Sequence, residues 1–422
     1  MGYEGILFPW NPLPMAARRS ADRSPCVTPQ RVNILSPEFR ADPHSGYAQL
    51  RRDTPVVQVE PAGFWAISRY DDVAFVIKNP QLFSSEGFKA AWQPAWVGYN
   101  PLANSMIATD GAGHARMRTL VSRAFNASAI QRLEARIRKL AHRLADELAQ
   151  KGEADFVSQF AMPLPTFVIG ELLGLDISLH HRFKGWSDDI ASVTPEPLSP
   201  EYAQRTLTAI SDATRYITEV IEARRHSPAE DLVSDLVRAE VDGQSLTTRE
   251  IVDFLILLLI AGLETTVHLL ANSLLFLAER PEESERLRAD PTLIPRFIEE
   301  MLRYDSPVQS LVRIVTSDVT VAGVTIPKGE VVLAIIASAN RDERQYPEPD
   351  RFDLHREQSS ISFGYGAHYC IGAQLARMEA RCGLEALLSR FSRFQRTSAE
   401  LTWSQAITVR GPHALPLRFT PA

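Results

Sequence analysis

The hydrophobic and polar positions of this chain follow two different periods. From about residue 112 to 305 apolar residues recur at helical spacing, interrupted by a Pro-rich stretch at 194–200. Between 57 and 68, and again from 312 to 336, apolar positions alternate around turns such as Ala322-Gly323. Spacings of three to four residues favour amphipathic helices, whereas alternation favours half-buried strands. The pattern therefore predicts a mainly α fold with a small β-rich part.

Shorter elements follow from turn residues and local composition. We expect a hairpin over 58–70, a short helix over 71–79, an irregular loop over 84–108 and a hairpin over 402–419. Residues 1–34 mix Pro, Arg and Ser without periodicity and are typical of a flexible tail. We find no linker or internal repeat, so residues 35–422 are expected to form one domain.

Composition narrows the class of protein. The 422 residues are 45% hydrophobic and carry a formal net charge of −6, which is ordinary for a large globular protein and argues against a nucleic-acid partner. The longest apolar run, 254–263, is shorter than the roughly 20 residues that span a membrane, and no secretory signal is visible. Three scattered cysteines favour a reducing compartment. We expect a soluble, cytoplasmic monomer without a membrane partner.

Cys370 follows a loop punctuated by glycines and precedes a helix-forming run that reaches about residue 391. A sulfur at a helix N-terminus is surrounded by backbone N–H groups that favour its anionic form. A thiolate held in this way can be the axial ligand of a haem iron. A buried cysteine that caps a Gly-rich turn is the structural alternative.

A long helix is expected from Thr248 to Arg280, with Ser245 or Thr247 as its cap. Its middle reads Ala261-Gly262-Leu263-Glu264-Thr265-Thr266, which places a carboxylate and two hydroxyls inside an apolar segment. One interpretation is a kinked core helix in which Thr265 bonds back to a carbonyl one turn earlier. The other is a functional groove.

Residues 363–376 fit the pattern F-x-x-G-x-H-x-C-x-G-x-x-L-A, which resembles the haem-binding signature of the cytochrome P450 family. The resemblance covers about residues 35–420. It implies a single triangular fold with haem b between the Glu264 helix and the Cys370 helix, and Cys370 as the iron ligand. The other cofactor-binding residues that it implies are His114, Arg118, Ala261, Arg313, Phe363, Gly364, His368 and Gly372.

The middle of the long helix resembles the acid–alcohol pair of that family. There Thr265 would hold dioxygen and water while Glu264 relays protons, because cleavage of the O–O bond needs two protons. Glu300 and Arg303, alone a common surface pair, are similar to the buried Glu-x-x-Arg pair of the family. Arg351 would be the third member of that structural triad, although Pro349 and Asp350 loosen the match.

The substrate pocket is the least specific part of the resemblance, since every candidate is also a plausible core residue. The aromatic residues of the expected loop over 84–108 nevertheless favour a bulky, mostly apolar substrate. The candidates are Phe88, Trp92, Trp96, Leu257, Leu258, Leu311, Val312 and Ile407.

Together these features indicate a haem-thiolate monooxygenase that hydroxylates or epoxidises a bulky hydrophobic molecule with O₂ and two electrons. The electrons would come from a ferredoxin and its reductase, docked on Arg116, Arg123, Arg377 and Arg381 unless these are simply solvated. We expect tailoring of a secondary metabolite such as a polyketide, macrolide or terpene. The alternatives are a catabolic hydroxylase of a terpene, steroid or fatty acid, a peroxide-using or isomerising enzyme, and a haem-binding protein without activity.

Overall fold

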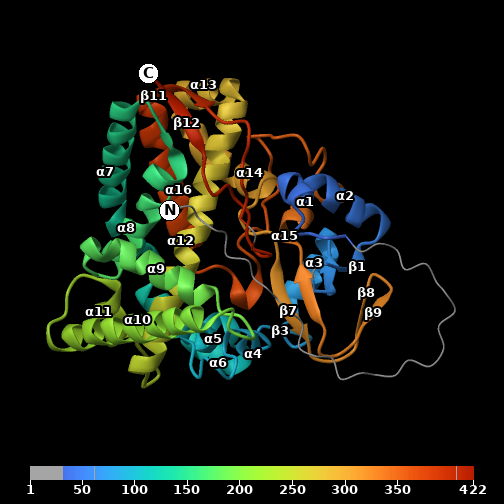
Figure 1. Ribbon diagram of the computed structural model, residues 1–422, viewed down its shortest axis with the longest axis vertical. Helices are drawn as coiled ribbons and strands as arrows, with labels where there is room; N and C mark the ends of the chain where they lie inside the picture. Colours follow the sequence, from blue (N-terminus) through green and yellow to red (C-terminus); the bar gives the residue numbers. More distant parts are fainter. Residues whose placement is uncertain (1–31, 61, 405) are drawn as a thin grey trace.

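The computed structural model describes residues 32–60, 62–404 and 406–422. Figure 1 shows the long helices α7, α10, α12 and α16 on one side of the molecule and the largest sheet with α1–α3 on the other. The helices are α1 Pro37–Ala41, α2 Pro43–Asp53, α3 Tyr70–Lys78, α4 Phe88–Trp92, α5 Pro101–Asn104, α6 Gly111–Ala124, α7 Ala127–Lys151, α8 Pro163–Leu172, α9 His180–Ala191, α10 Pro200–His226, α11 Leu232–Arg238, α12 Thr248–Glu279, α13 Pro281–Ala289, α14 Ile294–Tyr304, α15 Ile336–Ala339 and α16 Ala373–Arg390.

The strands form one sheet of five strands, in the order β1-β2-β10-β7-β3, one of three, in the order β11-β12-β4, and two hairpins, β5-β6 and β8-β9. They are β1 Val56–Val59, β2 Phe64–Ile67, β3 Phe83–Ser84, β4 Glu153–Asp155, β5 Glu240–Val241, β6 Gln244–Ser245, β7 Leu311–Val315, β8 Val319–Val321, β9 Val324–Ile326, β10 Val331–Ala334, β11 Phe391–Arg396 and β12 Pro416–Pro421. The mainly α fold with a small β part is thereby confirmed.

Most local predictions agree with these elements. The first hairpin pairs Val59 with Phe64, α3 lies where the short helix was expected, and no helix spans 192–199 between α9 and α10. The turn of the β8-β9 hairpin places Ala322 and Gly323 at φ values of 47° and 81°. Because positive φ costs glycine little, Gly323 suits this turn.

Two predictions were incomplete. The segment 84–108 contains α4 and α5, and Phe83 pairs with Val315 across the sheet. Near the C-terminus a single bridge joins Trp403 to Pro412, after which β12 pairs with β11 and β4. The predicted 402–419 hairpin is therefore shorter than expected, because its second strand has a better partner in β11.

The expected tail also ends earlier than residue 34. Ile34 is buried in a cluster with β1 and β2, and its N–H donates to the Glu60 carbonyl at 3.2 Å. Residues 32–34 therefore belong to the fold, whereas residues 1–31 lie outside the part of the chain that the structure describes.

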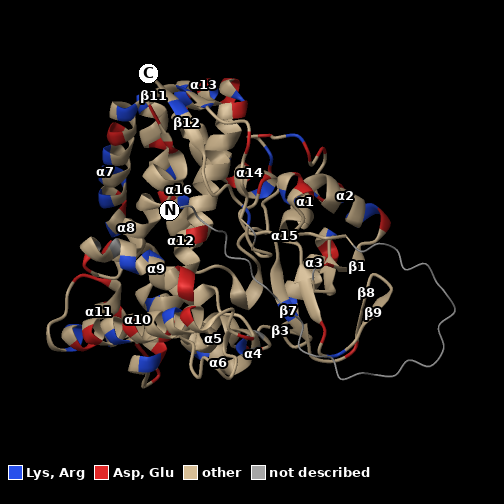
Figure 2. Ribbon diagram, in the orientation of Figure 1, with Lys and Arg blue, Asp and Glu red and all other residues tan. Residues whose placement is uncertain are grey.

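Helix α12 forms the centre of the helical side. Thr247 caps it, and Glu250 completes a capping box in which the side chain of each residue accepts a hydrogen bond from the backbone N–H of the other. Among the described residues it is the one helix long and apolar enough to cross a membrane, but 72% of its most apolar window is buried inside the molecule. It packs against α5, α8, α9, α10, α14 and α16, and Figure 2 shows few charges along it. These contacts make it a core helix.

Helices α12 and α16 run in the same direction. The elements that directly follow them, α13 and β11, are in contact and lie together at the top of Figure 1. A Cβ added at Gly383 of α16 would lie 3.2 Å from Leu270 of α12, so the helices meet there. At 1.5 Å per residue, Ala373 and Ala261 both lie about 14 Å before that contact. The start of α16 is therefore level with Ala261.

Candidate active site

The loop before α16 presents the Cys370 sulfur. Gly364 and Gly366 have φ values of 73° and 68°, a region that glycine enters freely. The Cys370 N–H donates to the Phe363 carbonyl at 2.9 Å, which closes the loop and places Phe363 beside the cysteine. A Cβ added at Gly372 would lie 3.8 Å from Cys370 Sγ. The loop is thus shaped around the sulfur.

The sulfur is open at its surface, yet burial raises the pKa of the Cys370 thiol. It therefore faces a recess within the molecule rather than bulk water. The N–H groups of Gly372 and Ala373 and the charges of Arg118 and Arg377 act in the opposite direction and favour the thiolate. A cation bound to the sulfur would stabilise the thiolate further.

At the level of this loop α12, which is otherwise mostly buried, has exposed residues. Ala261 is exposed, the Glu264 side chain is 52% exposed and Thr265 is half-buried, while Leu263 and Thr266 are buried. Positions i, i+3 and i+4 share one helix face. The face thus consists of a small residue, an acid and an alcohol, which together can admit a flat ligand and move protons.

Thr265 Oγ1 donates to the Ala261 carbonyl at 2.9 Å. This is the back-bond of the core-helix interpretation, but it does not exclude the other one, because the hydroxyl oxygen can still accept hydrogen bonds. A Cβ added at Gly262 would lie 3.0 Å from Ile169 Cδ1, so α8 packs closely against this part of α12.

Two of the predicted cofactor-binding residues that can donate hydrogen bonds to a carboxylate, Arg313 and His114, are buried without an acidic partner among the described residues. Arg313 is 8% exposed, and its Nη1 donates to the Val312 carbonyl at 2.8 Å. Burial lowers the pKa of Arg313 to about 10, and Asp110 only partly counters this. His114 is 3% exposed and its Nε2 has no partner in the described chain. Such groups suit the carboxylates of a bound ligand.

His368 differs from the expectation because it already has an acidic partner. Its Nε2 lies 3.1 Å from Asp110 Oδ1, and its ring lies 4.2 Å from that of His114 between centroids. Burial raises the pKa of Asp110, but hydrogen bonds from His368, Ser84 and the Ser85 N–H prevail and hold it at about 2. No sequence signal pointed to Asp110.

His114 and Arg118 lie at the same edge of the loop. Burial and the charges of His368 and Arg118 lower the pKa of His114 to about 4, so its ring is neutral at pH 7. Arg118 Nη2 donates to the Tyr369 carbonyl at 2.6 Å, directly beside Cys370. The structure thus brings His114, Arg118 and His368 together beside the Cys370 loop.

The buried triad contains a different arginine from the one predicted. Arg303 bonds Glu300 through Nε–Oε2 at 2.8 Å and Nη2–Oε1 at 2.7 Å, with both side chains at most 4% exposed. Arg356 Nε lies 3.3 Å from Glu300 Oε1. The Arg351 side chain is 60% exposed and pairs with Glu348. Arg351 contributes only its carbonyl, which accepts from Arg303 at 3.2 Å. The prediction of Arg351 was therefore wrong.

The pocket candidates divide into two groups. Leu257, Leu258 and Val312 are buried, whereas Leu311 and Ile407 are partly buried. The strand of Leu311 and the segment of Ile407 are neighbours, because Ser310 Oγ donates to the Ile407 carbonyl at 2.9 Å.

The aromatic candidates come from the segment between β3 and α6. Phe88 begins α4, while Trp92 and Trp96 are half-buried against the main core. Trp96 Nε1 donates to the Thr194 carbonyl at 3.0 Å, which ties this segment to the connection between α9 and α10.

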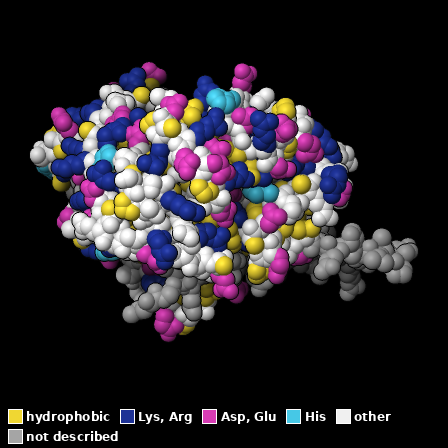
Figure 3. Space-filling view, turned by 90° about the horizontal axis from the view of Figure 1, so that it is seen from above, with side chains coloured by type: hydrophobic (Ala, Val, Ile, Leu, Met, Phe, Trp, Pro, Cys, Tyr) yellow, Lys and Arg dark blue, Asp and Glu magenta, His cyan; other side chains and the backbone are white. Residues whose placement is uncertain are grey.

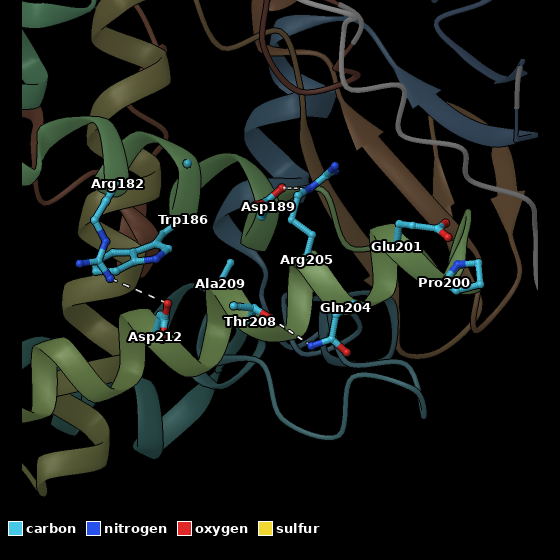
Figure 4. A pocket seen from close by; sticks show the side chains of 11 residues that line it. Arg182, Trp186, Asp189, Pro200, Glu201, Gln204, Arg205, Thr208, Ala209 and Asp212 are labelled. Atoms are coloured by element: carbon cyan, nitrogen blue, oxygen red, sulfur yellow. Dashed lines mark hydrogen bonds and ion pairs between the residues drawn. The ribbon is translucent and has the colours of Figure 1, made fainter.

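A groove of about 820 Å³ lies elsewhere, on the outer faces of α9 and α10 (Figure 4). Trp186 forms part of its wall, and the ion pairs Arg205–Asp189 at 2.8 Å and Arg182–Asp212 at 3.8 Å cross between the two helices. It contains none of the predicted site residues, so we locate the active site at Cys370 and α12.

Haem fits this site on three observations: an open sulfur at a helix N-terminus, a small exposed residue on the opposite core helix, and two buried hydrogen-bond donors, Arg313 and His114, without acidic partners among the described residues. Cys370 would hold the iron, and Arg313, His114 and Arg118 the carboxylates. Together the fold and the site define a haem-thiolate enzyme.

Comparisons with known proteins agree. The family model for cytochrome P450 matches residues 29–402. Cyclomarin C epoxidase CymV of Salinispora arenicola is 38% identical over 379 residues, which are 89% of this chain and 95% of that protein. The structure of cytochrome P450 CYP109Q5 from Chondromyces apiculatus has a TM-score of 0.86 at 40% identity and covers 93% of this chain and 99% of its own.

A third similar protein, CYP109E1 from Bacillus megaterium in complex with testosterone, has a TM-score of 0.80 at 36% identity, covering 90% of this chain and 99% of its own. This chain belongs to the cytochrome P450 family. It is a cytochrome P450 monooxygenase of the bacterial type.

Proposed function

We propose that this enzyme binds haem b at Cys370 and inserts one oxygen atom of O₂ into a C–H or C=C bond of a bulky hydrophobic molecule. The observation that supports this most is the acid–alcohol face of α12, level with the open sulfur of Cys370. The complete Glu264–Thr265 pair favours oxygenation over the peroxide-using, isomerising and non-enzymatic alternatives.

Bound haem supplies activation of O₂ and of the substrate bond. The chain supplies the surroundings. Cys370 would provide the thiolate ligand, and Phe363 would shield it on one side. The Thr265 hydroxyl oxygen can accept a hydrogen bond, and its O–H, which donates to the Ala261 carbonyl, can turn to another acceptor. Glu264, at the open end of the same face, carries protons between solvent and the hydroxyl. Arg313 and His114 orient the group through its carboxylates.

The pocket candidates and the relatives together support a substrate class. Trp92, Trp96, Leu311 and Ile407 present mostly apolar surface, which favours a large hydrophobic ligand. One relative is named an epoxidase of cyclomarin C. We infer oxidative tailoring of a secondary metabolite such as a polyketide, macrolide or terpene. The testosterone complex of another relative favours steroid oxidation as the second candidate.

Two electrons would come from a ferredoxin and its reductase. The proposed docking arginines are mostly neutralised within the chain: Arg377 pairs with Glu299, Arg381 with Glu134 and Arg116 with Glu250. Figure 3 likewise shows acidic and basic side chains interspersed on the face that it presents. Docking therefore depends less on net charge than the sequence alone suggested. We propose that the enzyme acts as a soluble cytoplasmic monomer.

The decisive experiment is the absorption spectrum of the reduced protein with carbon monoxide, followed by turnover with a surrogate ferredoxin and reductase. A strongly red-shifted Soret band in the wild type that is lost in Cys370→Ser, with unchanged helix content, supports the proposal. A band typical of histidine ligation, or no haem uptake, overturns it. Charge reversal at Arg116 and Arg377 should slow reduction by the ferredoxin, and unchanged reduction kinetics would overturn this docking face.

A further inference from the structure

A buried histidine lies behind the acid of the acid–alcohol pair. His268 is on α12, one turn after Glu264, and is 5% exposed. Its Nε2 lies 3.6 Å from Glu264 Oε1. Neither ring nitrogen has a hydrogen-bond partner within the described residues. A buried polar ring without a partner is costly unless another group or water completes it, so this position calls for an explanation.

The loop before β12 fixes the orientation of the ring. A Cβ added at Gly411 would lie 2.1 Å from His268 Nδ1 and 2.4 Å from its Cγ. The loop backbone thus occupies the space on that side of the imidazole, and Nε2 is the nitrogen left near Glu264. Any larger residue at 411 would displace the ring, which indicates that the position of His268 is imposed by packing.

The other charges near Glu264 are either engaged elsewhere or more distant. On α9, Lys184 forms an ion pair with Asp188, so that its charge is largely compensated. Asp188 itself repels the Glu264 carboxylate. His413, beyond Gly411 in the loop, interacts with both Glu264 and His268 by charge. Among the described residues His268 is the one group within ion-pair distance of Glu264.

We propose that His268 is a positioning residue for proton delivery: through Nε2 it holds the Glu264 carboxylate at the end of the α12 face. The inference rests on the proposed function, because Glu264 matters only if protons are delivered there.

The electrostatics agree with the geometry. Burial raises the pKa of Glu264, but His268, Lys184 and His413 more than offset this, and it lies below its ordinary value. Burial and the charges of His268, Arg40 and Lys184 lower the pKa of His413, while Glu264 raises it. Histidine is the side chain that ordinarily changes charge between pH 5 and 8.

The first test does not depend on turnover. In the reduced, CO-bound holoenzyme labelled with ¹³C-histidine, the ring signal of His268 is assigned by its loss in His268→Gln and His268→Asn. Its titration midpoint is then compared with that in Glu264→Gln, which leaves the ring and its packing in place. The midpoint should fall by about half a pH unit or more, because a negative neighbour is removed. His413→Gln should raise it. An unchanged midpoint in Glu264→Gln overturns the pairing.

The second test reads proton delivery. The fraction of electrons that appear in product is measured from pH 6 to pH 8 for the wild type, His268→Gln and the control His142→Gln. His142 is a half-buried histidine on α7 that also has an unpartnered ring nitrogen. His268→Gln should flatten the pH profile while His142→Gln keeps it. An unaltered profile in His268→Gln refutes the positioning role. Absence of any oxygenation would count against the proposed function alone, since the midpoints still decide the pairing.

Discussion

The Tyr99 hydroxyl lies 2.5 Å from Asp253 Oδ2 and joins the aromatic segment between β3 and α6 to the first turns of α12. Arg249 stacks on the Tyr99 ring at 3.6 Å from its centroid. Asp253 is 4% exposed, and its second carboxylate oxygen has no partner in the described chain. The segment that carries the pocket candidates Phe88, Trp92 and Trp96 is thus fastened to α12 by a buried acid.

This acid should make stability depend on pH. Burial raises the pKa of Asp253 from 3.8 to about 6, although Tyr99 and Arg249 lower it. The folded state therefore binds this proton more tightly than the unfolded state, and the resulting stabilisation is lost as pH rises from about 4 to about 6. The free energy of unfolding of Asp253→Asn, relative to that of the wild type, should therefore increase by up to about 3 kcal/mol as the pH rises from 4 to 7.

Urea unfolding at a series of pH values measures this difference. Asp71→Asn, an exposed acid on α3, is the control and should show no such trend. Parallel stability curves for Asp253→Asn and the wild type would show that the carboxylate titrates normally.

Removal of the Thr265 hydroxyl should uncouple electron use from oxygenation. Thr265→Ala keeps the helix but takes away the one hydroxyl on the α12 face, so reduced oxygen should leave as peroxide. We expect the fraction of electrons found in product to fall by about tenfold or more. NADPH consumption and peroxide are measured with the surrogate donor. Thr266→Ala, whose side chain is buried, is the matched control; equal coupling in the two variants contradicts the role of Thr265.

Arg356 and Arg351 should differ sharply in their effect on stability. Arg356→Ala removes a buried partner of Glu300 and should cost about 2–4 kcal/mol, because the carboxylate then keeps only one charged partner, Arg303, besides the Asp353 N–H. Arg351→Ala changes an exposed side chain and should stay within about 0.5 kcal/mol of the wild type. Chemical unfolding followed by circular dichroism gives both values. A larger loss in Arg351→Ala would restore the original prediction.

Arg313→Met should have opposite effects on the protein without and with haem. In the chain alone it removes a buried cation that lacks an acidic partner, so the free energy of unfolding should rise. Haem should be lost about tenfold faster, because a charge-assisted hydrogen bond to its carboxylate is gone. Haem transfer to apomyoglobin measures the rate. Arg123→Met, at an exposed position on α6, is the control and should change neither quantity. If the haem-free Arg313→Met protein were less stable than the wild type, Arg313 would not be an unpaired buried cation.

The parts that the sequence predicted well are those whose information is local. The capping box of Thr247 and Glu250, the glycines before Cys370 and the order of acid and alcohol on α12 all lie within a few residues. They specify a backbone path or a helix face directly. Resemblance to a family then assigned them a chemistry that spacing alone left open.

The contacts that were missed join distant segments. Arg356 reaches Glu300 across 56 residues and Asp110 reaches His368 across 258. Within 347–356 the Arg351 side chain lies outside and pairs with Glu348, while the Arg356 guanidinium lies at the Glu300 carboxylate. His268 was overlooked for a related reason, since within an apolar helix one histidine looks like a core residue until Gly411 and Glu264 are placed beside it.

The apolar surface of α12 has a consequence for the newly made chain. Its covering partners α14, α16 and β11 come later in the sequence, and α16 begins only at residue 373. Until that segment leaves the ribosome, a helix that meets the length and hydropathy criteria for crossing a bilayer lacks part of its cover. Synthesis that stops short of α16 would thus leave this apolar helix partly uncovered in a fragment prone to aggregate or to enter a membrane, so residues 373–422 contribute to solubility through the cover that they provide.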